Sequence, residues 1–248
     1  MTDGGATGDD VNGRMRPAPA GDLTRWDVTV PEAVAIQREL RGRLVPTPPP
    51  DFAPRHVAGA DISLDRDDPR GYAGIVVIDR TSMETVEEAT AAGELAFPYV
   101  PGLLSFRELP LLADAWARLR RRPDVVIFDG QGYAHPRRFG IACHGGVLFG
   151  VPSIGCAKTV LVGRHAPLAE ERGAMAEMVD RGEVVGMAVR LRARTKPVYV
   201  SIGHRIDLPT AVEVVMSVSV GFREPETTRR SHRLVNRLRV AGRGGVEE

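Results

Sequence analysis

Alternation between apolar and polar positions divides the chain into short extended segments and a few helices. A leading helix is predicted over 31–44, and the prolines at 46 and 48–50 end it. Later helices are predicted over 103–120, 139–149, 211–220 and 227–240. Strands are predicted over 57–63, 72–79, 85–91, 125–128, 153–157, 184–191 and 197–201.

The order of these segments predicts the fold class. A short polar stretch separates 72–79 from 85–91, which favours antiparallel neighbours. The run 125–128 is apolar throughout, as is typical of parallel strands buried on both faces. Antiparallel strands followed by strands that alternate with helices indicate an α/β fold, a mixed β-sheet flanked by helices on both faces, as in ribonuclease H-like proteins.

Composition changes this outline only at the amino end. Residues 1–22 are rich in Gly, Pro, Asp and Ala, so we expect a disordered tail followed by a single domain over 23–245. The total of 248 residues suits one large domain. Hydrophobic residues make up 43% and charged residues 26%, which are ordinary globular values and argue against disorder throughout.

Charge and cysteine content limit the classes of partner and compartment. Since 33 Lys and Arg nearly balance 32 Asp and Glu, any surface that binds nucleic acid must be local. The two cysteines, Cys143 and Cys156, lack zinc-site spacing and are too few for a disulfide scaffold, so a reducing cytoplasm is expected. No signal pattern opens the chain, and no apolar run approaches the roughly 20 residues of a bilayer span. We therefore expect a soluble protein without a membrane partner.

Three carboxylates stand where the pattern predicts apolar side chains. Asp61 lies inside the apolar strand 57–63, and Glu108 falls in the middle of the apolar stripe of the helix 103–120. Asp129 ends the run 125–128 and is followed by a glycine turn. Each has an ordinary alternative: a turn cap at Asp61, a helix kink at Pro110, and an Asp-Gly turn at Asp129.

Taken together, the three carboxylates favour a cation site. Converging carboxylates repel one another, so they shift their pKa values or bind a cation. Ligation by oxygen alone favours Mg²⁺ or Mn²⁺ over zinc. The chemistry that follows is phosphodiester hydrolysis, with Mg²⁺ as the expected cofactor and Mn²⁺ as its substitute.

Several motifs resemble the endonuclease V family. The longest is Phe-Pro-Tyr-Val-Pro-Gly-Leu-Leu-Ser-Phe-Arg-Glu at 97–108, followed by Phe-Asp-Gly-Gln-Gly at 128–132 and Ala-His-Pro-Arg at 134–137. Val-Ala-Gly-Ala-Asp at 57–61, Gly-Cys-Ala-Lys at 155–158 and Ser-Ile-Gly-His at 201–204 are similar to further family segments. The resemblance runs from about 57 to 238.

This resemblance implies catalytic roles for five residues. Asp61, Glu108 and Asp129 would be the metal-binding and catalytic carboxylates, with Glu108 acting partly through water. Lys158 would stabilise phosphate charge near the cut, and His232 would position or deprotonate the attacking water. The carboxylates also follow from their positions in the pattern, whereas Lys158 and His232 depend on the match.

The resemblance also implies a surface that binds nucleic acid. Tyr99, on a stiff loop between Pro98 and Pro101, would be a wedge in the duplex, and a turn that packs it into the core is the alternative. His204 is left between a structural and a functional role. The remaining expected contacts are of two kinds: glycines and adjacent residues that would line a pocket for the damaged base, and basic residues that would contact the DNA strand. They are Gly102, Leu103, Gly130, Gln131, Gly132, His135, Arg137 and Arg138.

The expected function is magnesium-dependent nicking of DNA that carries deoxyinosine or another deaminated base. By resemblance, the cut lies at the second phosphodiester bond 3′ to the lesion and leaves 3′-hydroxyl and 5′-phosphate ends. A monomer is expected. Two alternatives stay open: a ribonuclease H-like nuclease acting on inosine-containing RNA or on branched DNA, and a noncatalytic nucleic-acid-binding module. Inosine-containing single-stranded nucleic acid is an alternative partner to duplex DNA.

Overall fold

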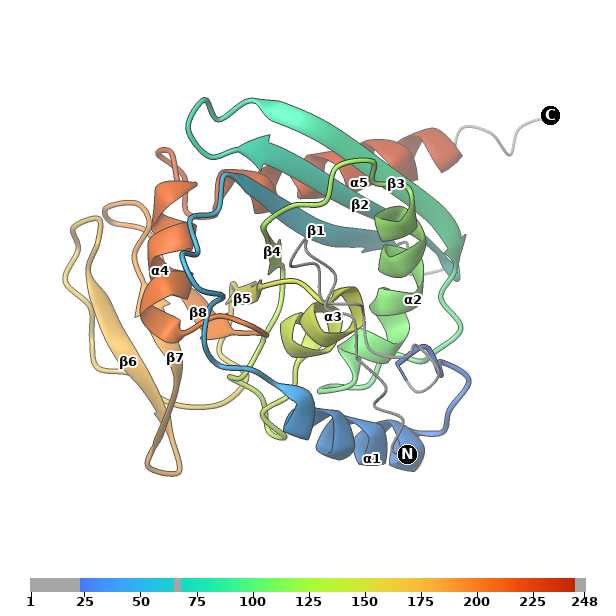
Figure 1. The fold of residues 1–248 in the computed structure, drawn as a ribbon, viewed down its shortest axis with the longest axis horizontal. Coiled ribbons are helices and arrows are strands. Elements are labelled where there is room, and N and C mark those ends of the chain that lie inside the picture. The colour runs from blue at the N-terminus through green and yellow to red at the C-terminus, as the bar shows by residue number, and fades with distance from the viewer. Residues whose placement is uncertain (1–22, 65–67, 244–248) are drawn as a thin grey trace, which may run out of the picture.

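One mixed sheet of eight strands organises the described residues, 23–64 and 68–243, in a computed structural model of the protein (Figure 1). The strand order is β3-β2-β1-β4-β5-β8-β7-β6. The predicted tail over 1–22 and the last two residues of the predicted domain lie outside the described residues. The strands are β1 His56–Leu64, β2 Arg70–Asp79, β3 Thr85–Glu94, β4 Val125–Phe128, β5 Ser153–Ala157, β6 Met175–Asp180, β7 Glu183–Val189 and β8 Val198–Ile202.

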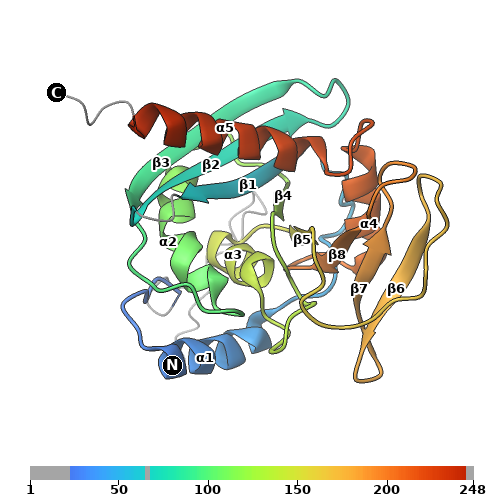
Figure 2. The same cartoon turned by 180° about the vertical axis from the view of Figure 1, so that it is seen from behind.

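Helices cover both faces of this sheet, which confirms the predicted ribonuclease H-like class. Figures 1 and 2 show α2 and α5 on opposite faces, and each of these faces has its own apolar core. Among the described residues, no helix is both long and apolar enough to cross a membrane. The helices are α1 Val30–Leu40, extended by a 3-10 turn Arg41–Arg43, α2 Leu104–Ala117, α3 Ile141–Phe149, α4 Leu208–Ser217 and α5 Glu226–Arg243.

The junction of β1 and β4 places two predicted site residues side by side. All four residues of β4 are buried, and the strand runs parallel to both β1 and β5, as the apolar run predicted. Ala60 pairs with Phe128 in this ladder, so Asp61 and Asp129 are the next residues of the two strands. Side chains alternate along a strand, which directs both aspartates to the face that α5 covers.

Helix α5 approaches β1 closely because the strand has a glycine at the crossing point. A Cβ on Gly59 would lie 2.4 Å from the backbone carbonyl carbon and oxygen of Thr227. Only glycine permits this contact. The first turn of α5 therefore lies directly on β1, and the next turn carries His232 over Asp61.

Strand β6 was not predicted from the sequence. It pairs antiparallel with β7 at one end of the sheet, but only Met178 among its six residues is buried. Its exposed face carries the apolar residues Met175 and Val179, so the sequence lacks the alternation between apolar and polar positions that marks a half-buried strand. The predicted helix over 31–44 also ends early as α-helix, at Leu40, before the 3-10 turn.

Candidate active site

The three predicted carboxylates interact electrostatically at the carboxyl ends of β1 and β4. Burial, then the charge of Asp61 and then that of Asp129, raises the pKa of Glu108 to about 8. Burial and the charge of Asp61 also raise the pKa of Asp129. Helix α2 continues through Pro110 and directs Glu108 toward the aspartates, so the predicted alternative of an outward-turned Glu108 does not hold.

Each aspartate has a basic partner. Lys158, directly after β5, donates from Nζ to Asp129 Oδ2 at 2.8 Å and lies 3.1 Å from Glu224 Oε2. His232 Nδ1 lies 2.8 Å from Asp61 Oδ2, and this hydrogen bond raises the pKa of His232. Burial lowers the pKa of Lys158, but the hydrogen bond and charge of Asp129 outweigh it and raise the pKa overall. Both predicted basic residues therefore contact a predicted carboxylate, and their catalytic roles stay predictions.

The donor set suits a hard divalent cation in its chemistry. Carboxylate oxygens are the ligands that Mg²⁺ and Mn²⁺ prefer, and a cation near Glu108 would offset the repulsion that raises its pKa. Within residues 23–64 and 68–243, however, no three His, Cys, Asp or Glu side chains converge closely enough to form a ready metal cage. Instead, Lys158 forms an ion pair with Asp129, and His232 forms a hydrogen bond with Asp61. The assignment of metal ligands stays a prediction.

A cavity of about 450 Å³ opens beside Asp129 and Lys158. Its walls come from the loop before α2, the first turn of α2, the turn after β4, the start of α3 and the segment after β5. Tyr99 stands at this cavity with 71% of its surface exposed, which excludes the alternative of a core-packed turn. The predicted contact residues that line it are Tyr99, Pro101, Gly102, Gly130, Gln131 and His135.

The other predicted contact residues lie behind or beside this wall. Leu103 is buried and its N–H donates to Val100, while Gly132 is buried and its N–H donates to Ser201 Oγ. Pro98 is exposed next to Tyr99. The backbone N–H groups of Leu103 and Gly132 are therefore already used inside the protein. The first turn of α2, whose N–H groups have no acceptor within the helix, also lines the cavity.

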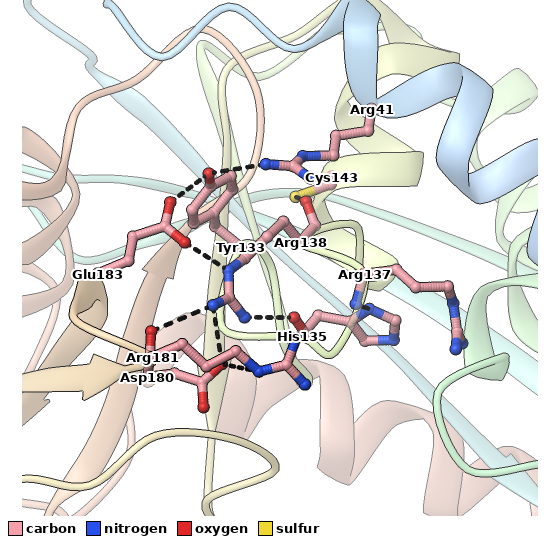
Figure 3. Close-up of polar contacts among 9 residues, drawn as sticks. All are labelled: Arg41, Tyr133, His135, Arg137, Arg138, Cys143, Asp180, Arg181 and Glu183. Carbon is pink, nitrogen blue, oxygen red and sulfur yellow. Dashed lines mark hydrogen bonds and ion pairs between the residues drawn. The ribbon is translucent and has the colours of Figure 1, made fainter.

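The basic residues after the turn contact protein groups. His135 is 2% exposed, and burial lowers its pKa to about 4, so the ring is neutral and Nε2–H donates to the Gly102 carbonyl at 3.0 Å. Arg137 Nη2 donates to the same carbonyl at 2.7 Å. Arg138 is buried in ion pairs with Asp180 and Glu183, so its expected phosphate contact is wrong (Figure 3).

His204 has a structural role. Its side chain is buried, and its Nδ1 accepts a hydrogen bond from the Val45 N–H at 3.4 Å. Burial lowers the pKa of His204 to about 4, so the ring is neutral at physiological pH. It does not line the cavity beside Asp129. The loop between β8 and α4 is thereby tied to the segment that follows α1.

Two residues near the site escaped the sequence analysis. Glu224 contacts Lys158, and Gln37 on α1 donates from Nε2 to the Gly102 carbonyl at 3.0 Å. Gln37 shares its buried helix face with Ala33 and Leu40. A polar residue in an apolar stripe was the signal used for Glu108, and it would have identified Gln37 as well.

Comparisons with known proteins place this geometry in a family. The family model for endonuclease V matches residues 38–233. An endonuclease V from Myxococcus xanthus is 62% identical over 220 residues, which cover 89% of this chain and 94% of that protein. The crystal structure of an endonuclease V from Streptomyces avermitilis has a TM-score of 0.82 at 42% identity and covers 90% of this chain and 97% of its own.

A further neighbour was solved with nucleic acid. Endonuclease V from Ciona intestinalis, in complex with a 24mer DNA containing an inosine followed by a ribo-adenosine, has a TM-score of 0.75 at 25% identity. The alignment covers 86% of this chain and 98% of the Ciona chain. Because the family match includes the sheet, the carboxylate edge and the cavity beside it, this chain belongs to the endonuclease V family of nucleases, which hydrolyse phosphodiester bonds.

Proposed function

We propose that the protein nicks DNA at the second phosphodiester bond 3′ to deoxyinosine or another deaminated base, leaving 3′-hydroxyl and 5′-phosphate ends. One observation carries the proposal: an open cavity of about 450 Å³ adjoins the carboxylate edge and has an exposed aromatic residue, Tyr99, at its wall. The Ciona relative bound to inosine-containing DNA supports this choice of substrate.

The Tyr99 loop and the cavity suit recognition of a flipped base. Two prolines stiffen the loop, so the exposed Tyr99 ring can occupy the gap that a flipped base leaves in the stack. Hypoxanthine pairs poorly, so it leaves the duplex at lower cost than a normal base. The backbone N–H groups of Leu104 and Ser105 open α2 and have no carbonyl one turn earlier in the helix, so they offer donors to the O6 of hypoxanthine.

The residues at the sheet edge would have different roles in hydrolysis. Family members generally need a divalent metal, which we propose is Mg²⁺, with Mn²⁺ as substitute; when bound, it polarises the phosphoryl group and activates water. Asp61 and Asp129 would hold it directly, and Glu108 partly through water. Lys158 would stabilise phosphate charge. His232, held by Asp61, can exchange a proton with the attacking water.

A nicking assay on a duplex with one deoxyinosine tests the proposal. We expect a single cut with Mg²⁺, with the stated ends, and none after EDTA or with Asp61→Ala. A matched duplex with deoxyadenosine at the same place is the control. Equal nicking by Asp61→Ala and wild type would favour the noncatalytic binding module, with the cleavage then coming from a contaminant.

The alternatives within nucleases need two further measurements. Side-by-side cleavage of matched DNA and RNA strands with inosine separates a deoxyribonuclease from an enzyme that prefers RNA. For branched DNA, Tyr99→Ala is informative, because a structure-specific nuclease does not need the aromatic ring. If this substitution left discrimination between inosine and normal DNA unchanged, the branched-DNA alternative would be preferred.

We also propose a monomeric cytoplasmic enzyme with one catalytic domain over 23–245. The two cysteines, Cys143 and Cys156, are buried and free, which suits a reducing compartment. Sedimentation at micromolar concentration tests the monomer. Limited proteolysis tests the tail over 1–22, which we expect to be removed before any cut inside the domain.

A further inference from the structure

The carbonyl of Gly102 is the most heavily bonded backbone acceptor at the cavity. Gln37 Nε2 and His135 Nε2 each lie 3.0 Å from it, and Arg137 Nη2 lies 2.7 Å from it. Three donors, one of them charged, meet an oxygen that has two lone pairs. Gly102 is the second residue after Val100 on the Tyr99 loop, so this cluster holds the carboxyl end of the loop.

Gly102 needs such a restraint because of its own backbone. Its φ is +81°, in the left-handed region that glycine alone adopts readily. A Cβ at this position would also lie 2.8 Å from Arg137 Nη2 and 3.3 Å from His135 Nε2. The Leu103 N–H donates to the Val100 carbonyl and closes the turn around Gly102, and the three donors restrain the same glycine a second time through its own carbonyl.

Gln37 joins the three donors into one unit. Its side chain is 1% exposed; Nε2 also donates to the Phe139 carbonyl at 3.1 Å, and Oε1 accepts from Arg137 Nε at 2.5 Å. His135 contributes in the same way, because its Nδ1 accepts from the Arg137 N–H at 3.2 Å while Nε2–H points to Gly102. Every polar atom of the Gln37 amide is thus engaged, and its role is to orient rather than to react.

Contacts with the β6–β7 hairpin, at the far end of the sheet, fix the segment that carries His135 and Arg137. Arg138 has a positive φ of +56° and donates to Glu183 at 2.8 Å, to the Asp180 carboxylate at 2.7 Å and to the His135 carbonyl at 2.9 Å (Figure 3). The Tyr133 hydroxyl donates to Glu183 at 2.6 Å. The β6–β7 hairpin, which supplies no residue to the cavity, thereby supports its wall.

We propose that Gln37, His135 and Arg137 are positioning residues for substrate discrimination, which hold Gly102 and so keep Tyr99 in the conformation that selects a deaminated base. The inference rests on the proposed function. These side chains act through Tyr99, so their removal lowers the fraction of enzyme with the competent loop. Removing an ordinary phosphate contact would instead weaken all duplexes alike.

The test compares Gln37→Met and Arg137→Ala in the wild-type and Tyr99→Ala backgrounds. Two selectivity ratios are measured: kcat/KM for the deoxyinosine duplex divided by that for the matched normal duplex, and, in EDTA, Kd for the normal duplex divided by Kd for the deoxyinosine duplex. We expect each substitution to lower both ratios about 3- to 10-fold in the wild-type background. In the Tyr99→Ala background we expect no further fall.

A matched pair of histidine substitutions controls for general destabilisation. His135→Asn and His204→Asn remove buried neutral rings whose pKa values burial lowers to about 4, but only His135 contacts Gly102. We expect the ratios to fall for His135→Asn and to stay at the wild-type value for His204→Asn. Arg137 is only partly buried, so Arg137→Ala keeps the test available if a buried variant does not fold.

Two outcomes would overturn the positioning role. One is an equal loss for both duplexes, which would make Arg137 a phosphate contact; the other is an undiminished effect in the Tyr99→Ala background, which would place the residues outside the action of the loop. Failure of the wild type to nick the deoxyinosine duplex would refute the proposed function itself, and it is separate from both outcomes.

Discussion

Gly59→Ala tests whether the close approach of α5 to β1 positions His232. The new methyl carbon would lie 2.4 Å from the carbonyl carbon and oxygen of Thr227, where ordinary contact begins at 3.4 Å. Both clashing atoms are backbone, so no side chain can rotate away. The first turn of α5 must therefore move outward by about 1 Å, or β1 must bend by the same amount.

The consequences of this movement can be worked out for stability and for the site. Overpacking typically costs about 1 to 3 kcal/mol, and a backbone clash belongs at the upper end, so we expect a loss near 3 kcal/mol. If the helix moves as a unit, the 2.8 Å separation of His232 Nδ1 and Asp61 Oδ2 grows to about 3.8 Å, beyond hydrogen-bond range. Losing a hydrogen bond to a charged group costs about 1.5 to 3 kcal/mol, or roughly 10- to 150-fold in nicking rate.

Urea denaturation and an NMR titration of His232 in EDTA measure the two effects separately. The hydrogen bond to Asp61 raises the pKa of His232, so the pKa should fall in Gly59→Ala. Gly74→Ala is the matched control, because its methyl would meet only side chains of α5, the nearest being Val235 Cγ1 at 2.7 Å. If Gly59→Ala unfolded within about 0.5 kcal/mol of wild type and kept the His232 pKa, the coupling would be refuted.

The remaining predictions concern charge pairing, the exposed tyrosine and the buried histidines. Lys158→Met should reduce nicking about 10- to 150-fold, measured with saturating Mg²⁺, because Asp129 and the phosphate lose their cation. Tyr99→Ala should leave the free energy of unfolding within about 0.5 kcal/mol of wild type, by urea denaturation, since the ring is 71% exposed. Burial lowers the pKa from 6.5 to about 4 in His135, to about 3 in His144 and to about 4 in His204. Below pH 6.5 the unfolded chain therefore binds protons that the folded chain does not. Stability should therefore fall as pH drops below 6.5, by about 2 kcal/mol per histidine at about pH 5, in urea denaturation across this range.

Apolar patterning predicted the part of the fold that has a buried face. The run 125–128 became a central parallel strand because burial on both faces demands an apolar sequence. The edge strand β6 carries almost no such demand and was missed. The apolar pattern therefore predicts elements that have a buried face. It does not predict elements that are held mainly by backbone hydrogen bonds to a neighbouring strand.

The same limit applies to the site. Asp61, Glu108 and Asp129 could be identified because each is a charge in an apolar context, which is costly without a partner. Arg137 and Arg138 look equivalent in sequence, yet one reaches the Gly102 carbonyl and the other is buried against Asp180 and Glu183. Which way each side chain points depends on the positive φ of Arg138 and on a hairpin more than forty residues later, and no local pattern contains that information.

The charge balance at the sheet edge links the bases to the carboxylates they accompany. Lys158 pairs with Asp129, His232 forms a hydrogen bond with Asp61, and Glu108, whose pKa is raised to about 8, is mostly protonated at neutral pH. A cation bound by these carboxylates would favour their ionised forms and would compete with Lys158 for Asp129. The Lys158 ammonium, which also contacts Glu224 at 3.1 Å, would then be available to a phosphate oxygen. The hydrogen bonds and ion pairs of this cluster thus reduce the cost of burying three acidic side chains. They also hold Lys158 at the sheet edge, where we propose that the substrate phosphate binds.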